Sequence, residues 1–411
     1  MKKLLLEVLN DIRPTTQYEN EILGKVSIII KKINKSIKHA KAVLGGSGAK
    51  GTWLKTFDAD IFVMFNYGKY KDKSGQLSDI LGKSLKKHFK ITRLHGSRDY
   101  FQIKQGKFTF EIIPILKIKK AGQAKNITDV SPLHSNFILK HKKLIDEMRL
   151  TKQFFKAARV YGAESYIQGF SGYVCEILTV YYGSFLKLIR AATRWKEKTV
   201  IDVKGYYKGK NVFMELNKSK LTSPLIVIDP VQKDRNAAAA LDHEKFEIII
   251  HRAKELLKRP SKEFFEIKIL AEKDISRKFP KSLLMLKAEP LNKKEDVAGA
   301  KMLKAFHFIE KSLSFNDFKI NESDMMWHGK DALFYYALES DKLPETKEVT
   351  GPPIKIRFHA ELFKKKHKNA FLKGNRLYAK EKRRYGTAKA LIKDIIKTSN
   401  IKNNVKDIRM V

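Results

Sequence analysis

Residues 44–60 read LGGSGAKGTWLKTFDAD, and the fold class that the sequence predicts depends on this stretch. Its first part is a turn rich in glycine and serine, which can present backbone N–H groups and a hydroxyl to a phosphate. Its last part enters an alternating segment of strand-forming residues, FDADIFVMF, at residues 57–65. Because successive side chains of a strand point to opposite faces, we expect Asp58 and Asp60 on one face and the apolar residues on the other.

A third acidic residue lies in a similar apolar context. Glu111 falls within FTFEII, residues 108–113, which we expect to form a second strand that Pro114 closes. An acid that faced a core would be costly, so alternation should turn Glu111 to the open face. Carboxylates that share a face repel each other unless a cation lies between them, and Mg²⁺ prefers hard oxygen ligands. The three acids therefore predict two Mg²⁺ ions that activate a hydroxyl and stabilise a leaving pyrophosphate.

Each of these motifs is weak evidence when it stands alone. Gly-Ser turns are common in loops, and a D-x-D pair is more often a solvated strand face. The combination of a Gly-Ser turn, a D-x-D strand and a later acid in an apolar strand is more specific. It resembles the signature of the polymerase-beta-type nucleotidyltransferase superfamily.

The composition favours a polyanionic partner. The 411 residues include 84 Lys and Arg against 44 Asp and Glu, a formal net charge of +40. Such an excess is typical of nucleic-acid binding, although charge alone leaves an anionic membrane or an acidic protein open. Cys175 is the single cysteine, so no internal disulfide can form. No apolar run approaches the ~20 residues of a membrane helix, so we expect no membrane partner and a cytoplasmic location.

The pattern of apolar residues and breakers predicts an α+β chain of several domains. The start, MKKLLLEVLNDIRP, should be an amphipathic helix, and a capping-box pattern at Thr16 and Glu19 should begin a helix that runs to about Gly45. Further helices are expected at about 137–161, 172–192, 236–257 and 296–313. Further strands are expected at 264–270, 282–290 and 332–340.

Four regions are expected from this pattern together with the resemblance. Residues 1–125 should form a nucleotidyltransferase head with a palm-like mixed sheet, and residues 126–260 a largely helical central domain that contacts nucleotide and RNA. Residues 261–350 should form an α+β RNA-binding domain. Residues 351–411 should form a basic tail region, because FKKKHK at 363–368 and KEKRR at 380–384 mix charge with aromatic neighbours.

Beyond the active-site stretch, motifs along nearly the whole chain resemble class I, archaeal-type CCA-adding enzymes. In the first half these are the turn and D-x-D strand at 46–60, NIT with SPLH at 126–134, and YGAE at 161–164. In the second half they are GFSGY, YGSF, DP with RNAA, GPP and GNRLY, at 169–173, 182–185, 229–238, 351–353 and 374–378.

The resemblance implies a function and a role for each matching residue. It implies template-independent addition of C, C and A to the 3′ end of tRNA from CTP and ATP, with recognition of the acceptor stem and T arm. Asp58, Asp60 and Glu111 would hold the metal ions, and Arg235 would help to read the base. The remaining contacts to the incoming nucleotide would come from Gly46, Ser47, Lys50, His134, Lys152 and Tyr161.

Three departures and two alternatives accompany this interpretation. Lys50 stands where the family usually has Arg, Glu111 where it usually has Asp, and the stretch at 55–57 is one residue shorter than usual. Lysine keeps the charge but loses the bidentate fork of arginine. The alternatives are another template-independent transferase, of the poly(A) or oligoadenylate type, and a catalytically silent RNA-binding relative. The sequence leaves the oligomeric state open, including a homodimer.

Overall fold

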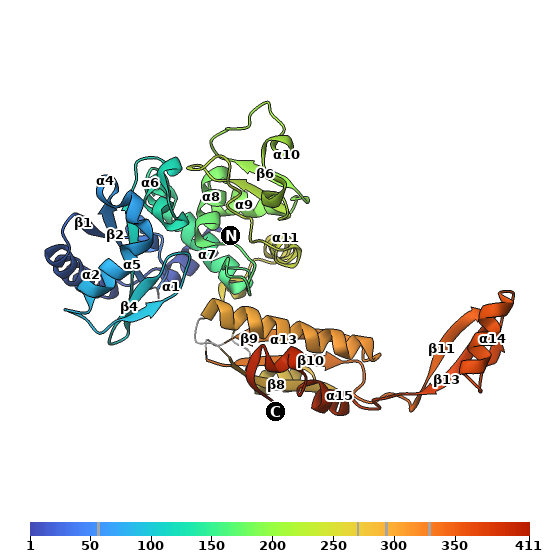
Figure 1. Cartoon of the computed structure of the whole chain (residues 1–411). Coiled ribbons are helices and arrows are strands. Elements are labelled where there is room, and N and C mark those ends of the chain that lie inside the picture. The colour runs from blue at the N-terminus through green and yellow to red at the C-terminus, as the bar shows by residue number, and fades with distance from the viewer. Residues whose placement is uncertain (56–57, 269–270, 292–294, 328–329) are drawn as a thin grey trace. The chain divides into compact units, whose positions relative to one another are not determined.

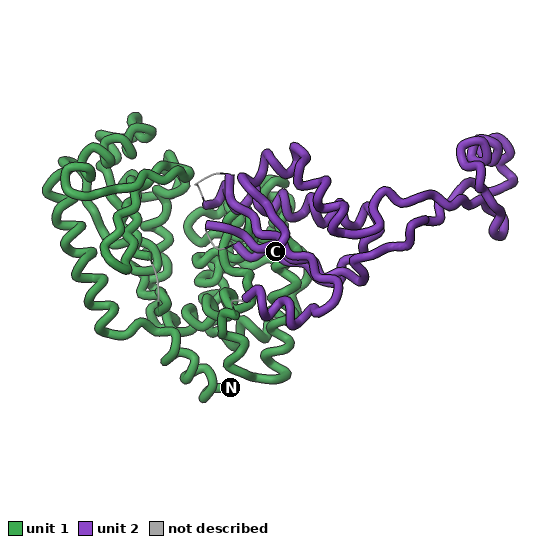
Figure 2. Tube along the Cα trace, turned by 90° about the horizontal axis from the view of Figure 1, so that it is seen from below, with its two compact units in different colours: residues 1–268 green, residues 269–411 purple. Residues whose placement is uncertain are grey.

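The computed structural model describes residues 1–55, 58–268, 271–291, 295–327 and 330–411. These residues form two compact units, Met1–Lys268 and Ile269–Val411 (Figure 2). The shortened stretch at 55–57 lies partly outside the described residues, because residues 56 and 57 are not among them.

The first unit contains a five-stranded mixed sheet in the order β1-β2-β5-β4-β3 (Figure 1). Strand β2 runs parallel to β5, and the other neighbours are antiparallel. This agrees with the expected palm-like mixed sheet. The strands are Ala40–Leu44 (β1), Ala59–Asn66 (β2), Thr92–Leu94 (β3), Tyr100–Gln105 (β4) and Phe108–Lys117 (β5).

Helices α2 and α5 cover one face of this sheet, and the other face stays open for a pocket. The helices of this region are Lys2–Ile12 (α1), Thr16–Ser36 (α2), Gly46–Lys50 (α3), Tyr67–Tyr70 (α4) and Leu77–Leu85 (α5). The apolar stripe of α2, with Ile22, Val26 and Ile29, packs with Leu81 of α5 against inward residues of the strands. The alternation of β2 and β5 sets which side chains join this core.

The prediction that α2 reaches Gly45 is wrong. The helix ends at Ser36, Ile37 has extended backbone angles, and residues Ala40–Leu44 form β1 at the sheet edge. The apolar residues of 37–44 fit a helical and a strand period equally well, and pairing of β1 with β2 decides between them. The N-cap is Thr15, whose side chain accepts the Tyr18 N–H, rather than Thr16.

Pro114 does not close β5, which continues to Lys117. The antiparallel pairing with β4 covers only Phe108–Ile112 of β5, so the missing N–H of Pro114 costs no bond to β4. Beyond Ile112, side chains form hydrogen bonds with backbone groups of β5 in place of β4. Arg98 donates to the Pro114 carbonyl at 3.0 Å, and Asp129 accepts the Leu116 N–H at 2.8 Å.

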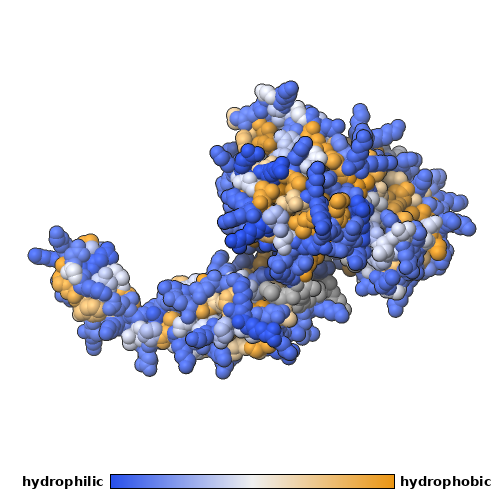
Figure 3. Space-filling view, turned by 180° about the vertical axis from the view of Figure 1, so that it is seen from behind, coloured by the Kyte–Doolittle hydropathy of each residue, from blue (hydrophilic) through white to orange (hydrophobic). Residues whose placement is uncertain are grey.

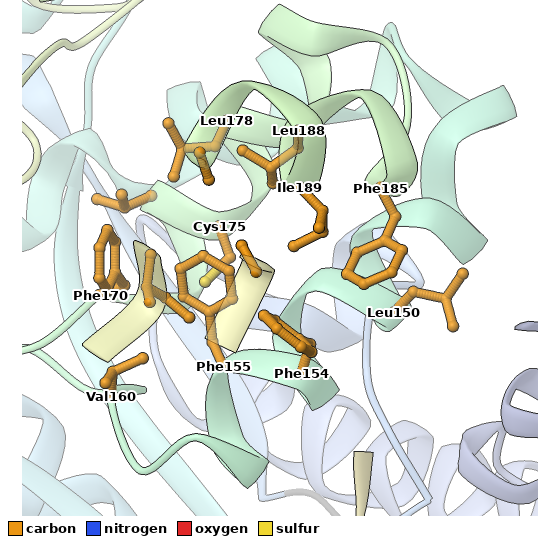
Figure 4. Packing of buried hydrophobic residues seen from close by; sticks show 14 of the residues in the cluster. Leu150, Phe154, Phe155, Val160, Phe170, Cys175, Leu178, Phe185, Leu188 and Ile189 are labelled. Carbon is orange, nitrogen blue, oxygen red and sulfur yellow. The ribbon is translucent and has the colours of Figure 1, made fainter. Parts of the chain in front are cut away.

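The rest of the first unit is mainly helical, and most of its helices pack around a large apolar cluster (Figure 4). Its helices are Ser131–Leu139 (α6), Ile145–Ala157 (α7), Gly172–Tyr182 (α8), Phe185–Ala192 (α9), Val212–Glu215 (α10) and His243–Lys258 (α11). Strands Thr199–Asp202 (β6) and Leu225–Ile228 (β7) form a parallel pair.

Three helices expected in this region are shorter than predicted. The helix expected at 137–161 is two helices, α6 and α7, with a 3-10 turn between them. The helix expected at 172–192 is broken at Gly183, whose φ of 78° ends α8 in the left-handed conformation. The helix expected at 236–257 begins only at His243, because Asp242 provides its N-cap.

The second unit holds a four-stranded sheet in the order β14-β8-β10-β9, with helix α13 packed against it. A three-stranded sheet, β11-β13-β12, carries helix α14. The helices are Glu272–Lys278 (α12), Glu295–Phe315 (α13), Arg357–Lys366 (α14), Ala388–Ile395 (α15) and Ser399–Lys402 (α16). The strands are Leu283–Pro290 (β8), Ile320–Trp327 (β9), Ala332–Leu338 (β10), Thr346–Pro353 (β11), Phe371–Lys373 (β12), Arg376–Lys382 (β13) and Val405–Met410 (β14).

Strand β14 pairs with β8 in this fold. Strands β8 and β10 and helix α13 lie where the sequence predicts them. The strand expected at 264–270 is wrong for its described part, because Lys262–Phe265 is a 3-10 helix and Phe265 packs into the core of the first unit. Residues 269 and 270 lie outside the described residues.

In the view of Figure 3, charged and polar side chains lie between the apolar patches of the surface. Within the second unit, exposed apolar side chains gather on the β11-β13-β12 sheet and its helix. They are Ile354, Ile356, Phe358, Leu362 and Leu372. Across the part of the chain that the structure describes, no helix has the length and apolar character needed to cross a membrane.

Candidate active site

A pocket of about 440 Å³ opens on the uncovered face of the five-stranded sheet. It brings together five residues that the sequence singled out: Gly46, Lys50, Asp60, Glu111 and His134. The other predicted residues, Ser47, Asp58, Lys152, Tyr161 and Arg235, do not line it. Its remaining walls come from Phe62, Gly96, Ser97, Arg98, Tyr100, Ile113, Thr128, Ser131, Ser135 and Tyr173.

Asp60 and Glu111 lie side by side on the pocket floor. They are register partners in the parallel pairing of β2 with β5, and both line the pocket, whereas their neighbours Ala59 and Phe110 are in the core. The predicted alternation is therefore confirmed for these two acids. Asp58 lies just before the first residue of β2.

Asp60 is held in an environment that disfavours its charge. Burial raises its pKa, Lys50 opposes that rise, Asp58 adds to it, and the result is about 6. The carboxylate packs directly on the backbone of Gly46, where a Cβ atom would lie 1.6 Å from Asp60 Oδ2. A cation beside Asp60 would relieve this unfavourable burial.

The metal-binding role of the three acids stays a prediction. Among the residues that the structure describes, no group of three or more His, Cys, Asp or Glu side chains is arranged so that it could hold a metal ion. The pocket itself supplies two adjacent carboxylates, Asp60 and Glu111, which are oxygen donors of the kind that Mg²⁺ prefers.

The Gly-Ser turn forms the short helix α3 beside Asp60. The Gly45 N–H donates to the Asp60 carbonyl at 2.7 Å, and the Thr52 N–H donates to the Ser47 carbonyl at 3.1 Å. The first bond joins the turn to β2 and the second closes the turn, and Lys50, the last residue of α3, lies in the pocket wall.

Lys50 and Lys152 share a carboxylate that the sequence analysis missed. Glu176 of α8 is fully buried and accepts from Lys50 Nζ and from Lys152 Nζ, each at 2.6 Å. Thr52 Oγ1 donates to the same carboxylate at 2.6 Å. Lys152 is 3% exposed, and its ammonium is engaged by Glu176 and Thr52 rather than facing the pocket. The sequence does contain a signal for Glu176, because an acid within the otherwise apolar helix GYVCEILTVYY needs buried partners.

Tyr161 lies behind this network. Its ring lies 5.0 Å from Lys156 Nζ in a cation–π contact. Its hydroxyl is so close to Gly172, at the start of α8, that a Cβ there would lie 2.5 Å from it. Burial raises the pKa of Tyr161, so the phenol stays protonated near neutral pH.

Asp229 organises the other side of the pocket. This fully buried carboxylate contacts His134 Nε2 at 3.1 Å and accepts from Arg235 Nη1 at 2.6 Å and from the Tyr173 hydroxyl at 3.2 Å. The rings of His134 and Tyr173 stack with centroids 4.1 Å apart. Burial favours the protonated form, but the hydrogen bond and charge of His134, with help from Val231 N–H and Arg235, lower the pKa of Asp229 to about 2.

Replacing Asp229 with alanine is expected to lower the free energy of unfolding by about 1–3 kcal/mol, because it leaves several partly buried donors without this partner. Urea denaturation measures this change. Asp234→Asn, on the same loop, is the control, since Asp234 is largely exposed and its ion pair with Lys220 spans 3.6 Å. Equal destabilisation by the two substitutions would contradict the organising role of Asp229.

Solved structures of terminal RNA transferases share the fold of about two thirds of this chain. One, described as showing the structural plasticity of Cid1 as a basis for its RNA terminal uridylyl transferase activity, matches with a TM-score of 0.52 and 14% identity. It covers 66% of this chain and 98% of that one. A cytoplasmic RNA terminal U-transferase matches with a TM-score of 0.51 and 15% identity, covering 65% and 98%. At such low identity these matches show the fold alone.

Three family models match the chain in succession. They are the nucleotidyltransferase domain at residues 26–145, the second domain of tRNA nucleotidyltransferase at 146–266, and the C-terminal domain of CCA-adding enzyme at 283–409. A CCA-adding enzyme of Methanosarcina mazei is 33% identical over 95% of this chain and 88% of its own length. Those of Methanocaldococcus jannaschii and Nanoarchaeum equitans are 31% and 35% identical, over 98% and 82% of this chain and 92% and 82% of their own. The chain therefore belongs to the family of CCA-adding enzymes and is an enzyme of the nucleotidyltransferase class.

Proposed function

We propose that this protein adds C, C and A to the 3′ end of tRNA without a nucleic-acid template, using CTP and ATP and releasing pyrophosphate. The observation that carries the proposal is the pocket in which Asp60 and Glu111 lie together beside Lys50 and His134. Acids and cations in one pocket suit a substrate that combines a metal ion with a triphosphate. The family of the chain supports the choice of substrate.

Asp60 and Glu111, with Asp58 at the start of β2, would hold Mg²⁺, and two ions are proposed. Their donor chemistry fits, because a half-buried carboxylate whose pKa is raised to about 6 gains from a nearby cation. When bound, such ions supply Lewis-acid activation of the attacking hydroxyl and stabilise the leaving pyrophosphate. The protein's own contribution is to keep the carboxylates on two paired strands, so that neither can move independently of the sheet.

The cationic and aromatic residues are proposed to bind the incoming nucleotide. Lys50 and His134 line the pocket and would contact the triphosphate, and Ser47 would add a hydroxyl from the same turn. Arg235 keeps one edge of its guanidinium on Asp229 and is about one-third exposed, so its other donors can reach a base. Lys152 and Tyr161 do not line the pocket.

The division of the chain into domains 1–125, 126–260, 261–350 and 351–411 is also proposed. The tRNA contacts are proposed to lie in the second unit. The three-stranded sheet and α14 combine exposed apolar side chains with the basic run at 363–368. Such a surface suits the shape and phosphates of an acceptor stem and T arm. The mass of the protein in solution, measured by light scattering, would decide between a monomer and a homodimer.

A tRNA that lacks its three terminal nucleotides tests the proposal. With Mg²⁺, we expect incorporation from CTP and ATP and little from UTP or GTP, and the tRNA should be preferred over an unstructured RNA of equal length. Each nucleotide is supplied separately and then together, and the products are separated on a denaturing gel. Long runs of A on any RNA would instead indicate a poly(A)-type transferase, and binding without incorporation would indicate a silent relative.

A further inference from the structure

Glu176 is a fully buried acid on the polar side of an otherwise apolar helix. Its neighbour in sequence, Cys175, points into the apolar cluster of the first unit (Figure 4). Glu176 itself turns toward α3 and α7, where Lys50 and Lys152 meet it. An ionised carboxylate without partners would be very costly at such a site, so the contacts of Glu176 must compensate for the loss of water.

The two carboxylate oxygens of Glu176 have different partners. Oε1 accepts from Thr52 Oγ1 and from Lys152 Nζ, each at 2.6 Å, and Lys152 also donates to Thr52 Oγ1 at 2.8 Å. Oε2 accepts from Lys50 Nζ at 2.6 Å. Thr52 and Lys152 therefore hold one side of the carboxylate in place, and the other side is directed at Lys50.

The two lysines of this network differ in their environment: burial lowers the pKa of Lys152, and Glu176 opposes that shift. Two lysines face one glutamate, and burial of Glu176 is outweighed by the lysines, which lower its pKa to about 2. Of the two lysines only Lys50 lines the pocket, with a side chain about 10% exposed. The ammonium group of Lys50 therefore lies where a triphosphate would enter.

We propose that Glu176 is a positioning residue that fixes the ammonium group of Lys50 in the wall of the nucleotide pocket, while Lys152 and Thr52 fix Glu176. A lysine on a five-residue helix has many rotamers, and Asp60 lies in the same pocket as an alternative anionic partner. Glu176 restricts Lys50 to one position and keeps it directed at the incoming phosphates. This inference rests on the proposed function, because the triphosphate is the ligand of Lys50.

The test compares Glu176→Gln with the wild type. The glutamine keeps the size of the side chain but cannot hold two ammonium groups by charge. We expect the KM for CTP and for ATP to rise about ten-fold or more with a smaller change in kcat, as when an interaction made before the chemical step is lost. The Kd for CTP with Mg²⁺, measured without tRNA, should rise in parallel.

A double-mutant cycle separates positioning from a general structural effect. If Glu176 acts through Lys50, then Lys50→Ala together with Glu176→Gln should be no worse than Lys50→Ala alone. Glu147→Gln is the matched control, because Glu147 is a carboxylate of α7 that accepts the Phe185 N–H at 2.7 Å outside the pocket. Its KM should match that of the wild type.

Several outcomes would overturn the inference. One is that Glu176→Gln leaves KM unchanged and only lowers the fraction of folded protein. Another is that the effects of Lys50→Ala and Glu176→Gln on KM multiply in the double variant. If Glu176→Gln alone does not fold, the substitution is made together with Lys152→Met, which removes a buried cation along with the buried anion. This double variant is compared with Lys152→Met alone, and the same rise in KM is expected. A wild type that incorporates neither CTP nor ATP would instead remove the proposed function, which is a separate result.

Discussion

Replacing Asp60 with asparagine is expected to lower the rate of nucleotide addition at least about a thousand-fold, because metal ions supply several kcal/mol of charge stabilisation in such reactions. The affinity for tRNA should stay close to that of the wild type, since the second unit, which is proposed to contact tRNA, is unchanged. Single-turnover kinetics on truncated tRNA and filter binding measure the two quantities. Removal of Mg²⁺ with a chelator should reproduce the loss of rate in the wild type.

The same substitution should not weaken the fold. The environment of Asp60 raises its pKa to about 6, so the ionised carboxylate is less favourable in the folded chain than in the unfolded one. Between the ordinary pKa of 3.8 and about 6 the folded state binds the proton more tightly, so the stability of metal-free wild type falls as pH rises through that window. Asp60→Asn lacks this loss and should equal or exceed the wild type in free energy of unfolding at pH 7.

A second carboxylate serves as the comparison for Asp60. Asp79 pairs with Arg93 on the surface and is 59% exposed, so Asp79→Asn should leave rate and stability nearly unchanged. If Asp60→Asn lost tRNA binding together with turnover, or unfolded more easily than the wild type, Asp60 would have a structural role instead.

The sheet that carries Asp60 and Glu111 could be predicted from sequence because strand alternation depends on residue order alone. Both acids stand between apolar residues with a period of two, and the core takes those residues whatever the rest of the chain does. Strand β1 could not be predicted in this way. Its five residues follow a helix whose apolar spacing they continue, and only pairing with β2 shows that they are extended.

The side-chain partners within the pocket depend on contacts that no local pattern encodes. Glu176 is 126 positions from Lys50 along the chain, and Asp229 is 95 positions from His134. The sequence marks Glu176 as an unusual acid in an apolar helix, but the identity of its cationic partners follows only from how α3, α7 and α8 pack. For the same reason the sequence could name Lys152 as a nucleotide contact without showing that its ammonium is buried against Glu176.

Replacing Gly46 with alanine is expected to reduce turnover at least about a hundred-fold, because a displacement of reacting groups by about 1 Å can cost that much. A Cβ at this position would lie 1.6 Å from Asp60 Oδ2 and 2.6 Å from its Cγ. Asp60 is on an interior strand of the sheet and its carboxylate packs against Gly46, so either the carboxylate or the Gly-Ser turn must move. Both belong to the proposed site, and single-turnover kinetics would register either movement.

Gly106→Ala separates this clash from the strain of the backbone. Gly46 and Gly106 have φ values of 54° and 62°, both in the left-handed region, where alanine costs about 1–2 kcal/mol. A Cβ on Gly106, in the exposed turn between β4 and β5, would meet nothing within 4 Å. Gly106→Ala should therefore lose some stability and keep its turnover, whereas Gly46→Ala should lose both. Equal turnover in the two variants would mean that the contact between the Gly-Ser turn and Asp60 does not set the geometry of the reaction.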